Sequence, residues 1–259
     1  MRARCILLGL SIAASSASAA PEPSVSLPDR PLLLRAGKFE GTMVVGLERL
    51  PRDDSDAAAS FVDVGTHMRT TAGGLELNLA AAVGLYASTD NTIMPALETL
   101  DSVGFAVRRE LAADLAIGAE LGIRGPSSDI TLYAPRVTAA YKAHVAPWAA
   151  ISIGAEAGID RGGMRSDMRV VGGELRAQLH PLKRIGIEGR AAGVRFYPQD
   201  GEGGPRGRGV VTLGLHALVE VTAELDAVLG CDAVAHGQDN LRCSVGFVVQ
   251  SERPQLIAD

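Results

Sequence analysis

The sequence predicts an all-β protein: a closed antiparallel transmembrane β-barrel of about twelve strands that follows an N-terminal signal peptide. The main observation is a two-residue period, in which Leu115, Ile117 and Leu121 alternate with polar or small residues such as Asp114 and Glu120. A period of two is typical of strands with one apolar and one polar face. Many such strands of about ten residues, arriving behind a secretory signal, suit a barrel whose outer surface touches lipid.

The first 19 residues have the order of a secretory signal. Arg2 and Arg4 precede an apolar run from Cys5 to Ala14, and small residues follow as far as Ala19. We therefore expect cleavage after Ala19. A membrane anchor is the alternative, but the apolar stretch is shorter than the roughly 20 residues that a spanning helix needs.

The charge balance excludes one class of partner. The chain has 25 Lys and Arg against 30 Asp and Glu, and the signal peptide takes two of the arginines with it. An acidic, exported chain has no electrostatic reason to bind nucleic acid. The 30 glycines and the scarcity of helix-capping patterns favour strands over helices.

Alternation between Lys38 and Gln250 predicts twelve strands joined by alternately short and long connections. The strands are expected at about 38–49, 59–70, 74–87, 102–111, 113–124, 129–143, 147–159, 167–179, 184–197, 208–220, 223–235 and 240–250. This pattern gives an even strand count and brings both ends of the barrel region to the side of the short turns. Residues 20–37 then form a periplasmic N-terminal segment, 38–250 the barrel and 251–259 a C-terminal tail.

A recurring hairpin format carries a family resemblance. It is found at Arg108 to Gly118, Ala146 to Gly154, Pro181 to Ile187 and Ala223 to Gly230. On this format, residues 38–250 resemble the bacterial outer-membrane β-barrel proteins. The resemblance implies export through the periplasm, insertion by the barrel-assembly machinery, and contact with outer-membrane lipid and lipopolysaccharide. Members usually end on an aromatic residue that closes the last strand, whereas here Ser251 to Asp259 follow it and Phe247 is the nearest aromatic.

The hydrocarbon that would surround the strands requires the barrel to be closed. Backbone groups in hydrocarbon must all be paired, and an open sheet would leave two edges unsatisfied. Outward sets run from Leu75 to Leu85 and from Val211 to Val221. Aromatic residues gather near the predicted strand ends, as interfacial girdles do; they are Phe39, Tyr141 and Trp148 at one end and Tyr86, Tyr133, Phe196 and Tyr197 at the other.

The inward positions are rich in charge, which does not suit a dry core. The predicted lumen-lining charged residues include Glu120, Arg136, Glu156, Glu174, Arg176, Glu188, Arg190, His216, Asp226 and Arg242. A turn centred on Leu182 would set Arg176 opposite Glu188 and Glu174 opposite Arg190. Such pairs either create a transverse field in a channel or brace the strands, at about 0.2–1 kcal/mol per pair. Inward glycine and alanine residues leave space for a narrow passage.

Two cysteines remain after the signal peptide, Cys231 and Cys243. A turn centred on Gly237 places them directly across a hairpin. They form either a disulfide, which an oxidising compartment allows, or two small apolar thiols on the lipid face. Two lone thiols with no nearby histidine in ligand spacing fall short of any zinc pattern, so we predict no metal site.

We predict no cofactor, no catalytic residue and no enzyme activity. The five histidines are scattered and no Gly-x-Ser-x-Gly elbow occurs. His216, approaching Asp226 across its hairpin, is the one residue that an outer-membrane lipid hydrolase would use. The glycines between Gly201 and Gly209 precede a strand, so they are interpreted as a loop and not as a phosphate cradle. Asp53, Asp54 and Asp56 are interpreted as a solvated turn and not as a calcium site.

Two functions remain open from the sequence. The first is a small passive, porin-like channel for small polar or ionic solutes. The alternative is a non-conducting structural or surface-interaction barrel whose lumen is closed by ion pairs. The sequence specifies neither a solute nor an oligomeric state.

Overall fold

The computed structural model of the chain describes residues 33–34, 36–50, 59–87, 99–112, 114–124, 132–162, 167–198, 208–222, 224–235 and 240–251. The expected signal peptide, the rest of the N-terminal segment and residues 252–259 lie outside these ranges. So do the acidic turn at Asp53, Asp54 and Asp56 and the loop at Gly201 to Gly207.

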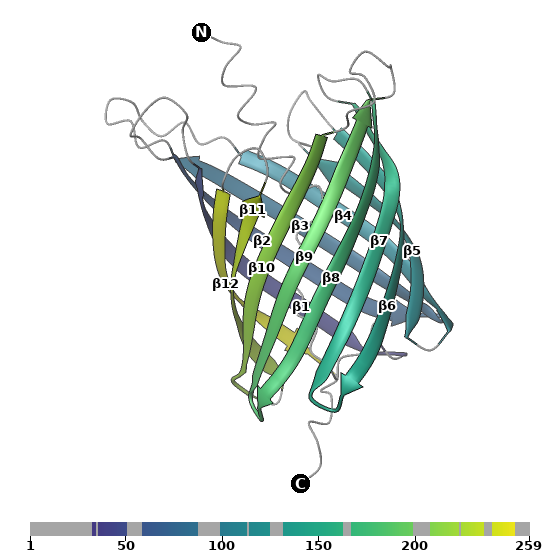
Figure 1. Cartoon of the computed structure of the whole chain (residues 1–259), viewed down its shortest axis with the longest axis vertical. Helices are drawn as coiled ribbons and strands as arrows, with labels where there is room; N and C mark the ends of the chain where they lie inside the picture. Colours follow the sequence, from purple (N-terminus) through teal and green to yellow (C-terminus); the bar gives the residue numbers. More distant parts are fainter. Residues whose placement is uncertain are drawn as a thin grey trace.

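Twelve antiparallel strands close into one barrel, as the sequence predicts (Figure 1). Each strand pairs with its neighbours in sequence, and β1 closes the ring against β12. The described residues contain no helix long and apolar enough to cross a membrane. The strands are β1 (Phe39–Leu50), β2 (Ala59–Ala72), β3 (Leu75–Ala87), β4 (Thr99–Ala112), β5 (Leu115–Arg124), β6 (Leu132–Ala146), β7 (Ala149–Gly162), β8 (Met168–Leu182), β9 (Ile185–Pro198), β10 (Arg208–Glu220), β11 (Leu225–Ala235) and β12 (Asn240–Gln250).

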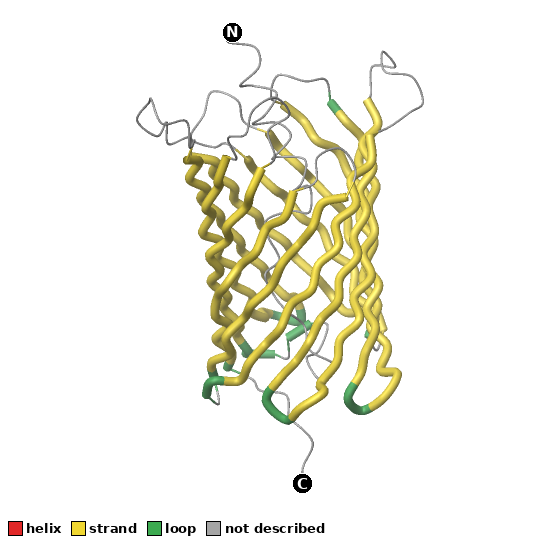
Figure 2. Tube along the Cα trace, turned by 60° about the vertical axis from the view of Figure 1, so that its left-hand side comes forward, coloured by secondary structure: helices red, strands yellow, loops and turns green. Residues whose placement is uncertain are grey.

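The two ends of the barrel differ in how the strands are connected. At one end, named here the turn end, the strands meet through 73–74, 113–114, 147–148, 183–184 and 221–224, which Figure 2 shows partly in green. The opposite end, the loop end, carries the connections 51–58, 88–98, 125–131, 163–167, 199–207 and 236–239. The β2–β3 turn has positive φ at both Gly73 (59°) and Gly74 (80°), as a two-residue hairpin turn requires.

The register of one hairpin differs from the prediction. Strand β8 continues through Pro181 to Leu182, so the turn moves to residues 183–184. Pro181 is accommodated because the β8–β9 ladder is irregular between Leu179 and Leu182, where a missing N–H removes no ladder bond. As a result, Arg176 lies opposite Arg190 and Gln178 lies opposite Glu188, two residues away from the expected pairing.

Parity separates the two faces of the wall. Odd-numbered residues such as Leu213 and Leu215 face outward and are 52% and 63% exposed. On β2 the parity reverses, because Arg69 pairs with the inward Glu40 of β1 and with the inward Asn78 of β3. The outward residues of β2 are therefore even-numbered, as exposed Met68 illustrates.

Apolar side chains also occupy part of the interior. Leu218, Val228 and Val248 pack together on β10, β11 and β12, and Val170, Phe196 and Val210 form a second cluster on β8, β9 and β10. The assignment of Phe196 to an aromatic girdle is therefore wrong. Its even position directs the ring inward, where it is 6% exposed.

The chain segment before β1 contacts the turn end. The amide of Leu34 donates a hydrogen bond of 2.7 Å to Glu76 Oε2, and the amide of Gly37 donates one of 2.8 Å to Thr71 Oγ1. Past β12, the amide of Ser251 donates to the carbonyl of Phe39 at 2.9 Å. The described ends of the chain thus meet at the turn end, in agreement with the even strand count.

Candidate functional site

Ion pairs and hydrogen bonds line the lumen, and one group of them near the turn end centres on Arg69. Its Nε and Nη2 donate to the two carboxylate oxygens of Glu40 at 2.9 and 3.0 Å, which is bidentate geometry. Its Nη1 lies 3.7 Å from Glu76 Oε2. All three side chains are buried, so one guanidinium compensates two desolvated carboxylates.

A second pair spans one strand. Arg242 on β12 donates from Nε to Asp63 Oδ1 on β2 at 3.0 Å, and β1 lies between these strands. The residue of β1 beneath the pair is Gly46, where a Cβ atom would lie only 2.7 Å from Arg242 Nε. The missing side chain lets the pair lie flat against the wall.

A glycine also lies beneath the pair formed by Arg136 of β6, although this pair joins adjacent strands. Its guanidinium bonds Asp160 of β7 and donates to the carbonyl of Ile159 at 2.8 Å, while Glu156 lies 3.9 Å away. A Cβ atom at Gly158 would lie 2.7 Å from Arg136 Cδ. The arginine side chain therefore lies over a glycine of the neighbouring strand.

The predicted partners on β8 and β9 do meet, but along diagonals. Glu174 bonds Arg176, and its Oε2 also forms an ion pair with Arg190, whose Nε lies 2.9 Å away. Arg176 Nη1 lies 3.8 Å from Glu188, which accepts a hydrogen bond of 2.9 Å from Gln178. A register error of two residues preserves the face on which a side chain lies, and long side chains reach diagonal neighbours.

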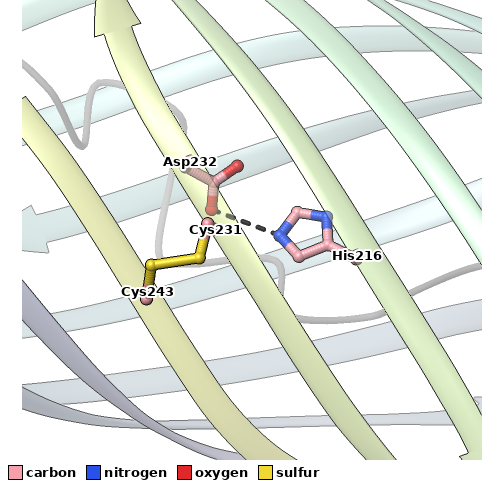
Figure 3. Close-up of a disulfide and its surroundings, with 4 residues drawn as sticks. All are labelled: His216, Cys231, Asp232 and Cys243. Atoms are coloured by element: carbon pink, nitrogen blue, oxygen red, sulfur yellow. Dashed lines mark hydrogen bonds and ion pairs between the residues drawn. A yellow bond between two sulfur atoms is a disulfide. The ribbon is translucent and has the colours of Figure 1, made fainter.

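His216 bonds a different carboxylate from the expected one. Its Nε2 lies 3.2 Å from Asp232 Oδ2, and Figure 3 shows the ring directed at that oxygen. The expectation of a contact with Asp226 is wrong, because the register sets Gly230 opposite His216. Asp226 accepts instead from Gln250 Nε2 at 2.9 Å. The described residues include no group of three or more His, Cys, Asp or Glu side chains arranged to hold a metal ion.

Beside these pairs, the lumen holds a cavity of about 180 Å³ bordered by strands β2 to β9. Small inward residues create the space, among them Ala80, Gly104, Ala106, Ala116, Ala140 and Gly154. The charged residues around it are Arg69, Arg108, Glu120, Lys142, Glu156, Glu174, Arg176 and Arg190, five cations against three carboxylates. Such a volume accommodates several water molecules or a small solute.

Sequence reasoning missed several polar residues of the lumen wall, among them Lys142, Gln178 and Asp160. Lys142 is 1% exposed and lines the cavity, Gln178 is fully buried, and Asp160 bonds Arg136. Lys142 stands beside the expected turn, yet β6 extends to Ala146; Asp160 was assigned to a loop, yet β7 extends to Gly162. The even number of each residue was the available signal.

The two cysteines lie on the outward face. Cys231 of β11 is directly opposite Cys243 of β12, and a disulfide joins them (Figure 3). The bond ties two strands together on the outer face of the wall. The disulfide and the His216–Asp232 contact lie on opposite faces of β11, because Asp232 directly follows Cys231 in the strand.

No protein-family model matches the sequence, and no curated protein matches it. Solved structures do. The COG4313 outer membrane channel from Pseudomonas putida F1 is 12% identical, covers 88% of this chain and all of its own, and superposes with a TM-score of 0.64. A KdgM porin in complex with disordered oligogalacturonate is 10% identical over 80% of this chain and 98% of its own, with a TM-score of 0.50.

A third similar structure belongs to a different functional class. The β domain of the Bordetella autotransporter BrkA is 11% identical over 83% of this chain and 99% of its own, with a TM-score of 0.52. At these identities the similarity establishes the barrel fold alone. Outer-membrane channels and porins share this fold, as does an autotransporter domain, so the function has to be argued from the lumen.

Proposed function

We propose that the protein is an outer-membrane channel that passively conducts small polar or ionic solutes, in the manner of a porin. The observation that carries the proposal is the charged cavity within the barrel, beside ion pairs that lie flat over Gly46 and Gly158. Because those pairs follow the wall, they stabilise the barrel without filling its centre.

The outer surface of the barrel supports a location in the outer membrane. Large apolar side chains stand exposed around the barrel, including Leu47 at 56%, Val137 at 62% and Leu229 at 54%. A continuous apolar belt of this kind is unfavourable in water and favourable in lipid. The proposal therefore includes insertion into the outer membrane by the barrel-assembly machinery and contact of the belt with its lipids.

The mixed signs around the cavity support weak selectivity. Arg108, Lys142 and Arg176 lie on the same cavity as Glu120 and Glu156. Small anions and cations each meet favourable groups there, so we expect a small preference for anions from the excess of cationic side chains.

A second candidate function is a non-conducting structural barrel, and the turn end favours it. Glu40, Glu76, Gln178 and Glu188 are at most 2% exposed. The amide of Leu34 reaches into this layer at Glu76. A lumen packed with polar groups at one end would block solutes while stabilising the barrel.

Planar-bilayer recording of the purified, folded chain separates the two candidates. The channel predicts stepwise conductance, which Gly154→Leu should reduce because that side chain would enter the cavity. The matched control is Gly189→Leu, where an outward Cβ meets nothing within 4 Å. Absence of current after confirmed insertion would refute the channel and favour the structural barrel; equal currents in the two variants would refute the assigned path.

A further inference from the structure

Three arginines stand side by side on the outward face at the loop end. They are Arg161 of β7, Arg169 of β8 and Arg195 of β9, and all three are exposed. The ladder sets Arg169 opposite Ile159 on one side and opposite Tyr197 on the other. Arg161 and Arg195 are each two residues along from these partners, so the three guanidinium groups come from diagonal neighbours on one patch of the wall.

Within the part of the chain that the structure describes, this arginine patch makes few contacts. Arg161 Nε lies 3.3 Å from Asp167 Oδ2, and the two side chains are 63% and 39% exposed. The guanidinium carbon of Arg195 lies 5.4 Å from the centre of the Tyr197 ring, within cation–π range. On the inward face of the same region, by contrast, Arg136 is buried against Asp160.

The depth of the patch on the wall identifies its surroundings. Going from Arg169 toward the turn end, the outward residues of β8 are Val171, Leu175 and Leu179, all exposed and apolar, with Gly173 and Ala177 between them. The patch therefore marks the upper edge of the apolar belt. Exposed Tyr133, opposite Arg161 on β6, adds an aromatic of the kind found at a membrane interface.

We propose that Arg161, Arg169 and Arg195 bind the phosphate groups of lipopolysaccharide in the outer leaflet, a site that rests on the proposed outer-membrane location. Guanidinium groups bind phosphate oxygens in bidentate geometry, and among the described residues this patch offers three of them beside the carboxylate of Asp167. Acyl chains of the same lipid would lie on Val171 and Leu175 below, so a phosphorylated glycolipid satisfies both halves of the surface.

The test titrates folded, detergent-solubilised protein with bisphosphorylated lipid A, its dephosphorylated form and inorganic phosphate, with native mass spectrometry as the readout. We expect the dephosphorylated lipid to bind at least about tenfold more weakly, and the combined variant Arg161→Gln, Arg169→Gln, Arg195→Gln to lose affinity for the phosphorylated lipid by a similar factor. The matched control replaces exposed Arg109 and Arg184 by glutamine at the turn end and should leave binding unchanged.

Several outcomes would overturn the site. The site would be refuted if the wild type and the combined variant of the three patch arginines bound lipid A equally. It would also be refuted if the control variant at the turn end lost as much affinity as the combined variant. Binding of inorganic phosphate as tight as that of lipid A would refute it as well. The single variant Arg169→Gln, with folding checked by heat-dependent gel mobility, provides a milder change. Bilayer conductance measured on the same samples is independent of the patch, so loss of current with intact lipid binding would count against the channel and not against this site.

Discussion

The two walls of the lumen are built from the same alternating strands, yet one is hollow and the other is packed. Along β3 to β7 the inward positions include Ala80, Ala106 and Ala140, and a cavity lies against them. Along β10 to β12 the inward positions include Leu218 and Val248, which are 2% and 0% exposed. Alternation decides which side chains face the lumen, whereas their size decides whether any lumen remains.

The largest expected effect comes from filling the hollow wall. Ala116 is 3% exposed and lines the cavity, so Ala116→Trp should remove most of the single-channel conductance by occupying that space. Ala119→Trp on the same strand faces outward and should leave conductance near that of the wild type. If both variants conduct equally, the passage does not run along β3 to β7.

The packed wall should instead respond in stability. Leu218→Ala should lower the free energy of unfolding by about 2–5 kcal/mol, because it leaves a void among Val228 and Val248. Urea unfolding in micelles measures this effect. Leu213→Ala, on the outward face of the same strand, should lose much less in the same measurement. Similar losses in the two variants would show that the inward cluster stabilises the barrel no more than an exposed outward side chain does.

Removing the disulfide should weaken the packed wall from its outer side. Replacing both Cys231 and Cys243 by serine should lower the free energy of unfolding by about 2–4 kcal/mol, through the freedom that the unfolded hairpin regains. Conductance should stay unchanged because the bond lies on the outward face. A changed conductance with intact folding would couple this bond to the lumen and contradict the separation of the two faces.

The smallest expected effect comes from the glycines beneath the charged side chains. A Cβ atom at Gly158 would lie 3.0 Å from the backbone Cα of Arg136, so Gly158→Ala should destabilise the barrel by about 1–3 kcal/mol through overpacking. Gly193→Ala on β9 meets nothing within 4 Å and should be neutral or slightly stabilising. Equal unfolding midpoints for the two variants would refute the crowding argument.

The sequence predicted the strands and faces well because a two-residue period is a local signal. Glu174, Arg176 and Arg190 contact one another on one face of the wall although their predicted register was wrong, since a slip of two residues leaves parity intact. The partner of His216 was missed because it depends on where the β10–β11 turn lies. The inward Val170 and Phe196 were not foreseen although both positions are even, because an apolar side chain is expected on the outward face and Phe196 was assigned to an aromatic girdle.

The glycines that lie beneath charged side chains of the lumen have a consequence for engineering. Gly46 lets Arg242 and Asp63 lie flat against the wall. The backbone then sets the width of the lumen at this point, and the two charged side chains set its electrostatic potential. Exchanging the two residues, as Arg242→Asp with Asp63→Arg, would then redraw the local potential while leaving the bore as wide as before. In nanopore design, the width of the lumen and its electrostatic potential could thus be varied separately on one scaffold.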